Sequence, residues 1–152
     1  MQRSSALEYA LKLLGFRART EKELRERLVG KKYELDNIDD VLAKLTKISL
    51  INDQKFAENY VRDKLSISRR GPRRIYFELI KRGVAKEIAE VATKLISREE
   101  ELETAESLLQ SRQRQWFKLD PLVRKRRAIG LLARRGFSSQ VISQQLKNLD
   151  RE

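Results

Sequence analysis

One complete helix, with the signals for both of its ends, lies in the stretch Gly71-Pro-Arg-Arg-Ile-Tyr-Phe-Glu-Leu-Ile-Lys-Arg-Gly-Val84. Pro72 suits the first position of a helix, where its missing N–H group leaves no hydrogen bond unmade. Ile75 and Leu79 are four residues apart, so they lie on the same side of that helix. Gly83 suits the left-handed residue that commonly follows a helix. The stretch therefore predicts one short helix that buries a single side.

The same arrangement recurs 53 residues later, where Gly83 aligns with Gly136. Both copies contain two basic residues, an apolar pair at four-residue spacing, two more basic residues, a glycine and an apolar residue. A weaker copy lies at 22–45, in which Lys31-Lys32 aligns with Arg82-Gly83. A pattern that returns at a fixed period is typical of repeat proteins. The sequence therefore predicts a tandem array.

Helical spacing of apolar residues extends along the rest of the chain, and no sustained alternation with a period of two predicts a strand. Capping boxes, in which two side chains satisfy free N–H groups of a first turn, are expected at Ser5 with Glu8, Thr20 with Glu23, and Ser97 with Glu100. We expect helices over residues 6–18, 21–31, 37–50, 53–69, 72–82, 86–96, 98–116, 121–135 and 139–149. They predict an all-α fold of three tandem three-helix repeats, at 1–51, 52–97 and 98–152, that form an elongated, curved array.

Basic residues dominate the charge of the chain. It has 34 Lys and Arg against 22 Asp and Glu, a formal net charge of +12, which favours a polyanionic partner. Two windows hold most of the excess: residues 62–83 have 8 basic and 2 acidic residues, and residues 112–136 have 9 and 1. We expect nucleic acid or a nucleoprotein filament to be contacted by Arg69, Arg70, Arg73, Arg74, Lys81, Arg82, Arg124, Lys125, Arg126, Arg127, Arg134 and Arg135.

Aromatic residues lie among these arginines, where a ring can stack on an unpaired base. Phe77 lies on the basic side of its helix, and both stacking on a base and packing between repeats are compatible with that position. Trp116 also lies in a basic window, and packing is the better interpretation of it because a lone indole is more often buried.

Several classes of chemistry are excluded by composition. The chain has no Cys and no His, which excludes disulfides, thiol catalysis, a histidine base and the usual zinc sites. The acidic run from Glu99 to Glu106 is interpreted as the start of a helix, where negative charge is favourable. We therefore expect no catalytic residue, no metal and no cofactor. No apolar run approaches the roughly 20 residues of a membrane span, and the first residues lack the apolar part of a signal peptide; the expected location is the cytoplasm.

Four segments, in their order and spacing, resemble the RecX family of bacterial regulatory proteins. They are Thr20-Glu-Lys-Glu-Leu-Arg-Glu-Arg-Leu28, Leu50-Ile-Asn-Asp-Gln-Lys-Phe56, the stretch 71–84 quoted above, and Leu131-Leu-Ala-Arg-Arg-Gly-Phe137. The resemblance covers about residues 6–149. It implies a non-enzymatic regulator that binds the RecA–single-stranded DNA filament and inhibits its ATPase, recombinase and coprotease activities, in DNA repair, recombination and the SOS response. Double-stranded DNA is a further candidate partner, and we expect a monomer that does not contact membranes.

Other functions remain open at this point. Three-helix units with a short turn are also typical of helix-turn-helix DNA-binding modules, which would act without RecA. A carboxylate-dependent nuclease and a helical scaffold for an acidic protein are two further alternatives. Within the RecA interpretation, both inhibition of RecA and stabilisation of its filament are compatible with the sequence.

Overall fold

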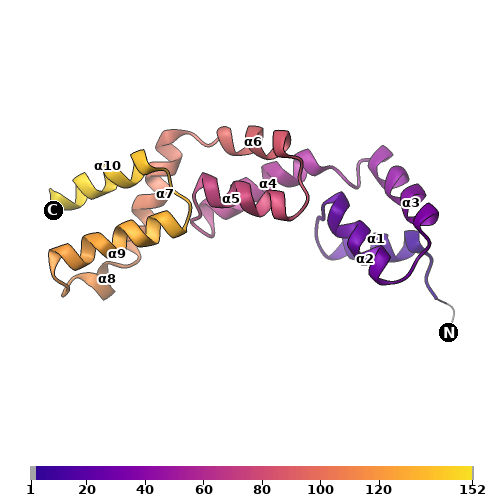
Figure 1. Ribbon diagram of the computed structural model, residues 1–152, viewed down its shortest axis with the longest axis horizontal. Coiled ribbons are helices and arrows are strands. Elements are labelled where there is room, and N and C mark those ends of the chain that lie inside the picture. The colour runs from indigo at the N-terminus through magenta and orange to yellow at the C-terminus, as the bar shows by residue number, and fades with distance from the viewer. Residues whose placement is uncertain (1–2, 152) are drawn as a thin grey trace.

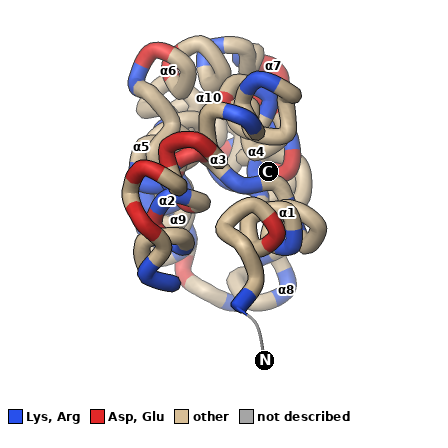
Figure 2. The backbone as a smooth tube through the Cα atoms, turned by 90° about the vertical axis from the view of Figure 1, so that its right-hand side faces the viewer, with Lys and Arg blue, Asp and Glu red and all other residues tan. Residues whose placement is uncertain are grey.

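The computed structural model describes residues 3–151, and all regular secondary structure within that range is helical. The helices are α1 (Ala6–Phe16), α2 (Glu21–Gly30), α3 (Leu35–Lys47), α4 (Asp53–Ser66), α5 (Pro72–Lys81), α6 (Lys86–Lys94), α7 (Arg98–Gln110), α8 (Gln113–Trp116), α9 (Pro121–Arg134) and α10 (Ser139–Asp150). They form three groups in a row along the long axis of the molecule (Figure 1). Seen along that axis, the groups overlap one behind another (Figure 2). The expectation of an elongated all-α array of three-helix repeats is confirmed.

Most helix starts follow the local signals of the sequence. Ser5, Thr20 and Ser97 each accept a hydrogen bond from the backbone of the third helical residue. The glutamate at that third position accepts one in return from the backbone of the capping residue. Both prolines stand at the start of a helix, as expected. These local contacts involve residues at most three apart in sequence, which is why the sequence predicts them well.

The single helix expected over 98–116 is wrong, because the chain breaks it after Gln110 into α7 and the short α8. At the break, the hydroxyl of Ser111 donates to the carbonyl of Leu108 at 2.5 Å. A serine hydroxyl that competes for backbone groups in this way weakens the helix locally. The change of direction allows Trp116 to pack against the core of the third group. Packing is as expected for this residue, but it occurs within its own repeat and not between repeats.

Helices α1, α3, α4 and α6 end before the expected ends of 6–18, 37–50, 53–69 and 86–96. For α3 and α4 the reason is a residue in the left-handed conformation soon after the helix, Ser49 with φ of 63° and Arg69 with φ of 51°. Such a φ is incompatible with a right-handed helix. Neither residue is a glycine, so the sequence contained no clear signal for these ends.

Each group of helices encloses its own apolar cluster. The fully buried residues include Leu24, Leu28, Ile38, Leu42 and Leu45 in the first cluster, Ile75, Leu79 and Ala89 in the second, and Ala105, Ala128, Leu132 and Val141 in the third. Three small cores in a row, in place of one deep core, are typical of repeat proteins, in which each unit contacts its neighbours only.

Two joints connect the cores. Each joint brings the C-terminal end of the second long helix of one repeat to the N-terminal end of the second long helix of the preceding repeat. At the first joint, the hydroxyl of Thr20 before α2 donates to the carbonyl of Arg82 after α5, at 2.6 Å. At the second joint, the N–H of Gly71 before α5 donates to the carbonyl of Arg135 after α9, at 2.7 Å. Helices α9, α5 and α2 therefore follow one another head to tail. The negative end of one helix dipole meets the positive end of the next at each joint, which is favourable.

The glycines of the repeat lie at these joints. Gly83 and Gly136 have positive φ values of 94° and 88°. A Cβ atom at Gly136 would lie 2.3 Å from the backbone nitrogen of Arg74, and one at Gly83 would lie 2.3 Å from Cβ of Lys22. Lys32, the aligned residue of the first repeat, has φ of 62° and is exposed. Glycine is therefore required where the neighbouring repeat docks, and a side chain is tolerated where the aligned residue is open to solvent.

Candidate nucleic-acid interface

A groove between α5 and α9 brings together basic side chains of the second and third repeats. It is lined by Arg73, Arg74, Phe77, Glu78 and Lys81 from α5, and by Ala133, Arg134 and Gly136 from the end of α9. A second groove continues from it along α9 toward α8, lined by Arg112, Gln115, Trp116, Arg126, Arg127, Leu131 and Arg134. Arg134 lines both, so the two form one continuous surface, which we call the basic groove.

Helix geometry explains why α5 presents these residues together. Arg73, Phe77 and Lys81 are four residues apart, so they form one row along the helix. Ile75 and Leu79 point to the opposite side and are completely buried in the core. The burial of the apolar side therefore orients the basic row outward, and the second joint places that row beside the end of α9.

Six cations of the basic groove carry no ion pair with another residue of the range 3–151. They are Arg73, Lys81, Arg112, Arg126, Arg127 and Arg134. Arg74, by contrast, is held at 3.0 Å by Glu78. The six unpaired cations keep their hydrogen-bond donors for an external acceptor such as phosphate.

Glu78 is the acidic residue that lines the α5 side of the groove. It accepts hydrogen bonds from Tyr60, from Arg70 at 2.7 Å and from Arg74 at 3.0 Å. Burial alone would raise the pKa of Glu78, but these hydrogen bonds and the positive charge of Arg70 hold the pKa below its ordinary value. Glu78 therefore stays ionised at neutral pH and fixes Arg70 and Arg74 in place.

Gly130 leaves room for the side chain of Arg134 on the surface of α9. A Cβ atom at position 130 would lie 2.9 Å from the Nη1 atom of Arg134. The guanidinium thus lies back along its own helix, one turn toward the N-terminus. This position lets Arg134 line both halves of the basic groove.

Four of the residues expected to face nucleic acid belong to the joints. Arg70 is held by Glu78, and Arg82 lies 3.4 Å from Glu23 of the first repeat. Arg135 donates to the carbonyl of Ser68 at 2.7 Å across the second joint. Arg69 is the half-buried left-handed residue just before α5. Arg82 and Arg135 thus connect neighbouring repeats, whereas Arg70 is held within its own repeat. The sequence pattern did not indicate these contacts.

The field around Arg135 is strongly positive. Burial lowers the pKa of Arg135, and the charges of Arg74, Arg112, Arg70 and Arg69 lower it further. Like charges that converge on one site repel each other, and this repulsion is relieved when an anion binds. Arg135 thus lies among other arginines at the second joint, and Glu78 offsets part of their charge through its pairs with Arg70 and Arg74.

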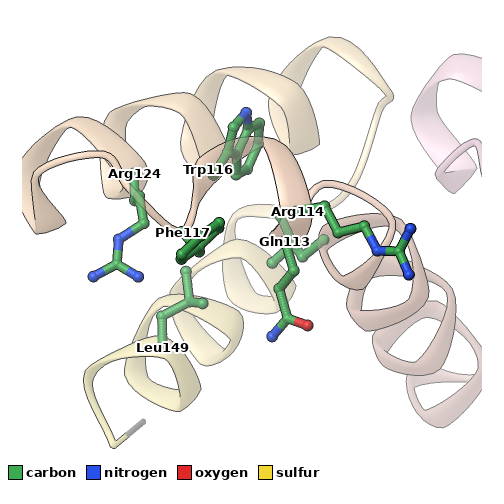
Figure 3. Close-up of a pocket in the computed structure, with 7 residues that line it drawn as sticks. Gln113, Arg114, Trp116, Phe117, Arg124 and Leu149 are labelled. Carbon is green, nitrogen blue, oxygen red and sulfur yellow. The ribbon is translucent and has the colours of Figure 1, made fainter.

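Arg124 and Lys125 lie outside the basic groove, at the C-terminal end of the array. Arg124 lines an apolar pocket with Leu109, Phe117 and Leu149, in which the Phe117 ring points toward Leu149 (Figure 3). Lys125 is paired with Asp150 of α10 at 2.5 Å. The structure thus places six of the twelve expected residues in the basic groove, namely Arg73, Arg74, Lys81, Arg126, Arg127 and Arg134.

One basic residue of the groove was missing from the expected set. Arg112 lies in the turn between α7 and α8 and lines the groove opposite Arg126 and Arg127. The sequence places it inside the basic window, but an uninterrupted helix would have directed it elsewhere. Its position depends on the break after Gln110.

The acidic run at the start of α7 contains a residue with a structural role. Glu101 is buried and accepts a hydrogen bond from the backbone N–H of Ser138, at the start of α10, over 2.7 Å. It thus caps a helix 37 residues away in sequence. Within residues 3–151, no group of three or more acidic side chains is arranged to hold a metal ion. The same part of the chain contains no helix that is both long and apolar enough to span a bilayer.

Comparisons with known proteins agree with this architecture. Three domain models of one family match: the first three-helix domain of RecX at residues 6–45, the second at 52–92 and the third at 99–146. Regulatory protein RecX of Mycobacterium sp. (strain JLS) is 36% identical over 138 residues, 88% of this chain and 75% of that protein. The protein of the same name from Amycolatopsis mediterranei is 33% identical over 132 residues, 87% of this chain and 75% of that protein.

A solved structure shares the whole arrangement of helices. The crystal structure of RecX from Lactobacillus salivarius superposes with a TM-score of 0.86 at 28% identity, over 97% of this chain and 96% of that one. Both the local domains and their order in space are therefore shared. The chain belongs to the RecX family of regulatory proteins.

Proposed function

We propose that this protein binds the RecA–single-stranded DNA filament through its basic groove and inhibits the ATPase, recombinase and coprotease activities of RecA. The observation that supports this proposal is the continuous groove across the second joint, with six cations that have no ion-pair partner within residues 3–151. An elongated body with a continuous basic surface suits a long polyanionic partner better than a small one.

The mechanism follows from the shape of the molecule. Three repeats in a row would contact more than one neighbouring subunit of a filament, together with the DNA between them, if the long axis follows the filament (Figure 1). ATP turnover in a filament depends on the arrangement of its subunits, so a protein that binds one arrangement more tightly shifts the population toward it. Equal affinity for both arrangements would change nothing, so the inhibition requires a preference.

A helix-turn-helix module that reads bases without RecA is the less favoured candidate. In such modules the first residues of the second helix contact base edges in the major groove. Here the start of α5 is occupied, because the N–H groups of Gly71 and Arg73 donate to the carbonyls of Arg135 and Gly136. The start of α2 is engaged in the same way by the bond from Thr20 to Arg82.

The test is RecA ATP hydrolysis on single-stranded DNA with this protein added well below the amount of RecA. The groove variant replaces three unpaired cations, Arg126→Gln, Arg127→Gln and Arg134→Gln. The matched control removes the same charge from exposed residues of the first repeat, Lys12→Gln, Lys44→Gln and Lys47→Gln. We expect the wild type and the control to inhibit and the groove variant to lose most of the inhibition.

Direct binding to the same DNA gives the second readout. Loss of three phosphate contacts should reduce the slope of log affinity against log salt by about 2, since each contact on single strands contributes roughly 0.7. Equal losses in the groove variant and the control would contradict the role of the groove. Inhibition by the wild type only at DNA-saturating amounts would contradict action on the filament and favour the DNA-binding module.

A further inference from the structure

Phe77 exposes 56% of its surface at the centre of the α5 side of the basic groove. Its neighbours Ile75 and Leu79 are completely buried, so the core of the second repeat is complete without it. The ring makes an edge-on contact with Tyr76, with centroids 5.2 Å apart. A single exposed aromatic residue is ordinary on a protein surface. What distinguishes Phe77 is the chemistry around it.

Cations surround the ring on three sides. Arg73 and Lys81 lie one helical turn before and after Phe77, about 6 Å away along the axis, and Arg134 faces it from α9. None of the three is ion-paired within residues 3–151. The guanidinium carbon of Arg73 lies 5.9 Å from the ring centroid, where the attraction between cation and ring keeps it close. Phosphate-binding groups and an aromatic face thus occupy one site.

We propose that Phe77 is a stacking platform for an unpaired nucleobase, with Arg73, Lys81 and Arg134 binding the phosphates on either side. Aromatic rings beside cations are the usual way in which proteins hold single strands without reading their sequence. In a duplex each base is already stacked between its neighbours, so its face is not available to the ring. The site therefore selects single-stranded over double-stranded nucleic acid.

The second repeat is the place where this selection occurs. In the alignment of repeats, the position of Phe77 is occupied by Gly130 in the third repeat and by Glu26 in the first. At this aligned position neither the third nor the first repeat has an aromatic side chain. Trp116 of the third repeat also lines the groove, but it is partly buried against the core of its own repeat. This inference rests on the proposed binding of nucleic acid in the basic groove and adds the residue that distinguishes the two forms of DNA.

The test compares Phe77→Leu with the wild type on oligothymidylate and on a hairpin duplex that carries the same number of phosphates. Fluorescence anisotropy over a series of salt concentrations measures both affinities. We expect about tenfold weaker binding to oligothymidylate, a change of less than twofold for the hairpin, and an unchanged salt slope because no charge is removed. Phe117→Leu, which alters an exposed ring outside the groove, should leave both affinities unchanged.

A second variant reports stacking directly. In Phe77→Trp, oligothymidylate should quench the fluorescence of the introduced indole more strongly than it quenches the fluorescence of Trp116 in the wild type. The hairpin should not quench the fluorescence of the introduced indole. Equal effects of Phe77→Leu on both DNAs, or no effect on either, would overturn the inference. If the groove variant described above loses binding while Phe77→Leu does not, the stacking platform fails and the proposed function stands. If the groove variant binds normally, the proposed function fails first.

Discussion

Gly130 illustrates how one residue without a side chain controls the position of a charged one. Helix interiors disfavour glycine relative to alanine because of its backbone freedom. Here the guanidinium of Arg134 fills the space beside Gly130. A Cβ atom at position 130 would lie 2.9 Å from the Nη1 atom of Arg134. The obstructing atom is the end of a flexible side chain, so an added methyl group displaces Arg134 without breaking the helix.

We therefore expect Gly130→Ala to raise the free energy of unfolding by up to about 1 kcal/mol and to weaken binding to single-stranded DNA by up to about tenfold. Urea denaturation and anisotropy measure the two effects. Gly15→Ala is the matched control, because nothing lies within 4 Å of a Cβ atom there; it should gain stability and keep its affinity. Identical affinities of the two variants would show that the position of Arg134 does not affect binding.

At the scale of the elements, backbone atoms take part in both joints between the repeats. The second joint uses the N–H groups of Gly71 and Arg73 and the carbonyls of Arg135 and Gly136. Such close contact requires that no Cβ atom intervene: one at Gly71 would lie 2.5 Å from the carbonyl carbon of Gly136. The glycines of the repeat therefore serve the contact between repeats as well as the end of each helix.

Gly136→Ala should lower the free energy of unfolding by more than about 2 kcal/mol. The left-handed conformation costs a residue with a Cβ atom roughly 1–2 kcal/mol, and the clash with the backbone of Arg74 adds to this cost. Lys32→Ala, at the aligned position of the first repeat, should change the free energy of unfolding by less than about 0.5 kcal/mol. Both are measured by urea denaturation. A small effect of Gly136→Ala would mean that the joint opens without cost.

At the scale of the whole molecule, three small cores leave much surface exposed. The accessible surface is 10484 Å² for a mass of 17.9 kDa, whereas a compact monomer of this mass exposes about 8,000 Å². The excess reflects the arrangement of the repeats in a row (Figure 1). A long body suits the proposed contact with several subunits of a filament.

Small-angle X-ray scattering of the full chain should give a radius of gyration clearly above the roughly 15 Å of a compact domain of this length. The value should change little with salt, because the hydrogen bonds and close packing at both joints remain when salt screens the ion pair between Arg82 and Glu23. A radius near 15 Å would show that the repeats fold back on one another in solution, and it would contradict a filament-spanning role.

The helices, their starts and the number of repeats could be predicted from the sequence alone. Capping boxes, prolines and apolar spacing act between residues three or four apart, so they are written locally in the chain. The helix ends at Ser49 and Arg69 and the break at Ser111 were not predicted. The boundaries of the repeats at 51/52 and 97/98 stay a prediction.

The candidate site, unlike the helices, could be predicted from the sequence only in part. Local sequence identified the basic windows, and the outward row of Arg73 and Lys81 follows from helix periodicity. Only the tertiary structure distinguishes Arg82 and Arg135, which hold the joints, and Arg70, which is paired with Glu78 in its own repeat, from the arginines of the groove. All of these arginines have the same charge and a similar spacing in the sequence. Their roles therefore depend on which helix end of the neighbouring repeat lies beside them. That pairing is made between residues up to 67 positions apart, and no local pattern records it.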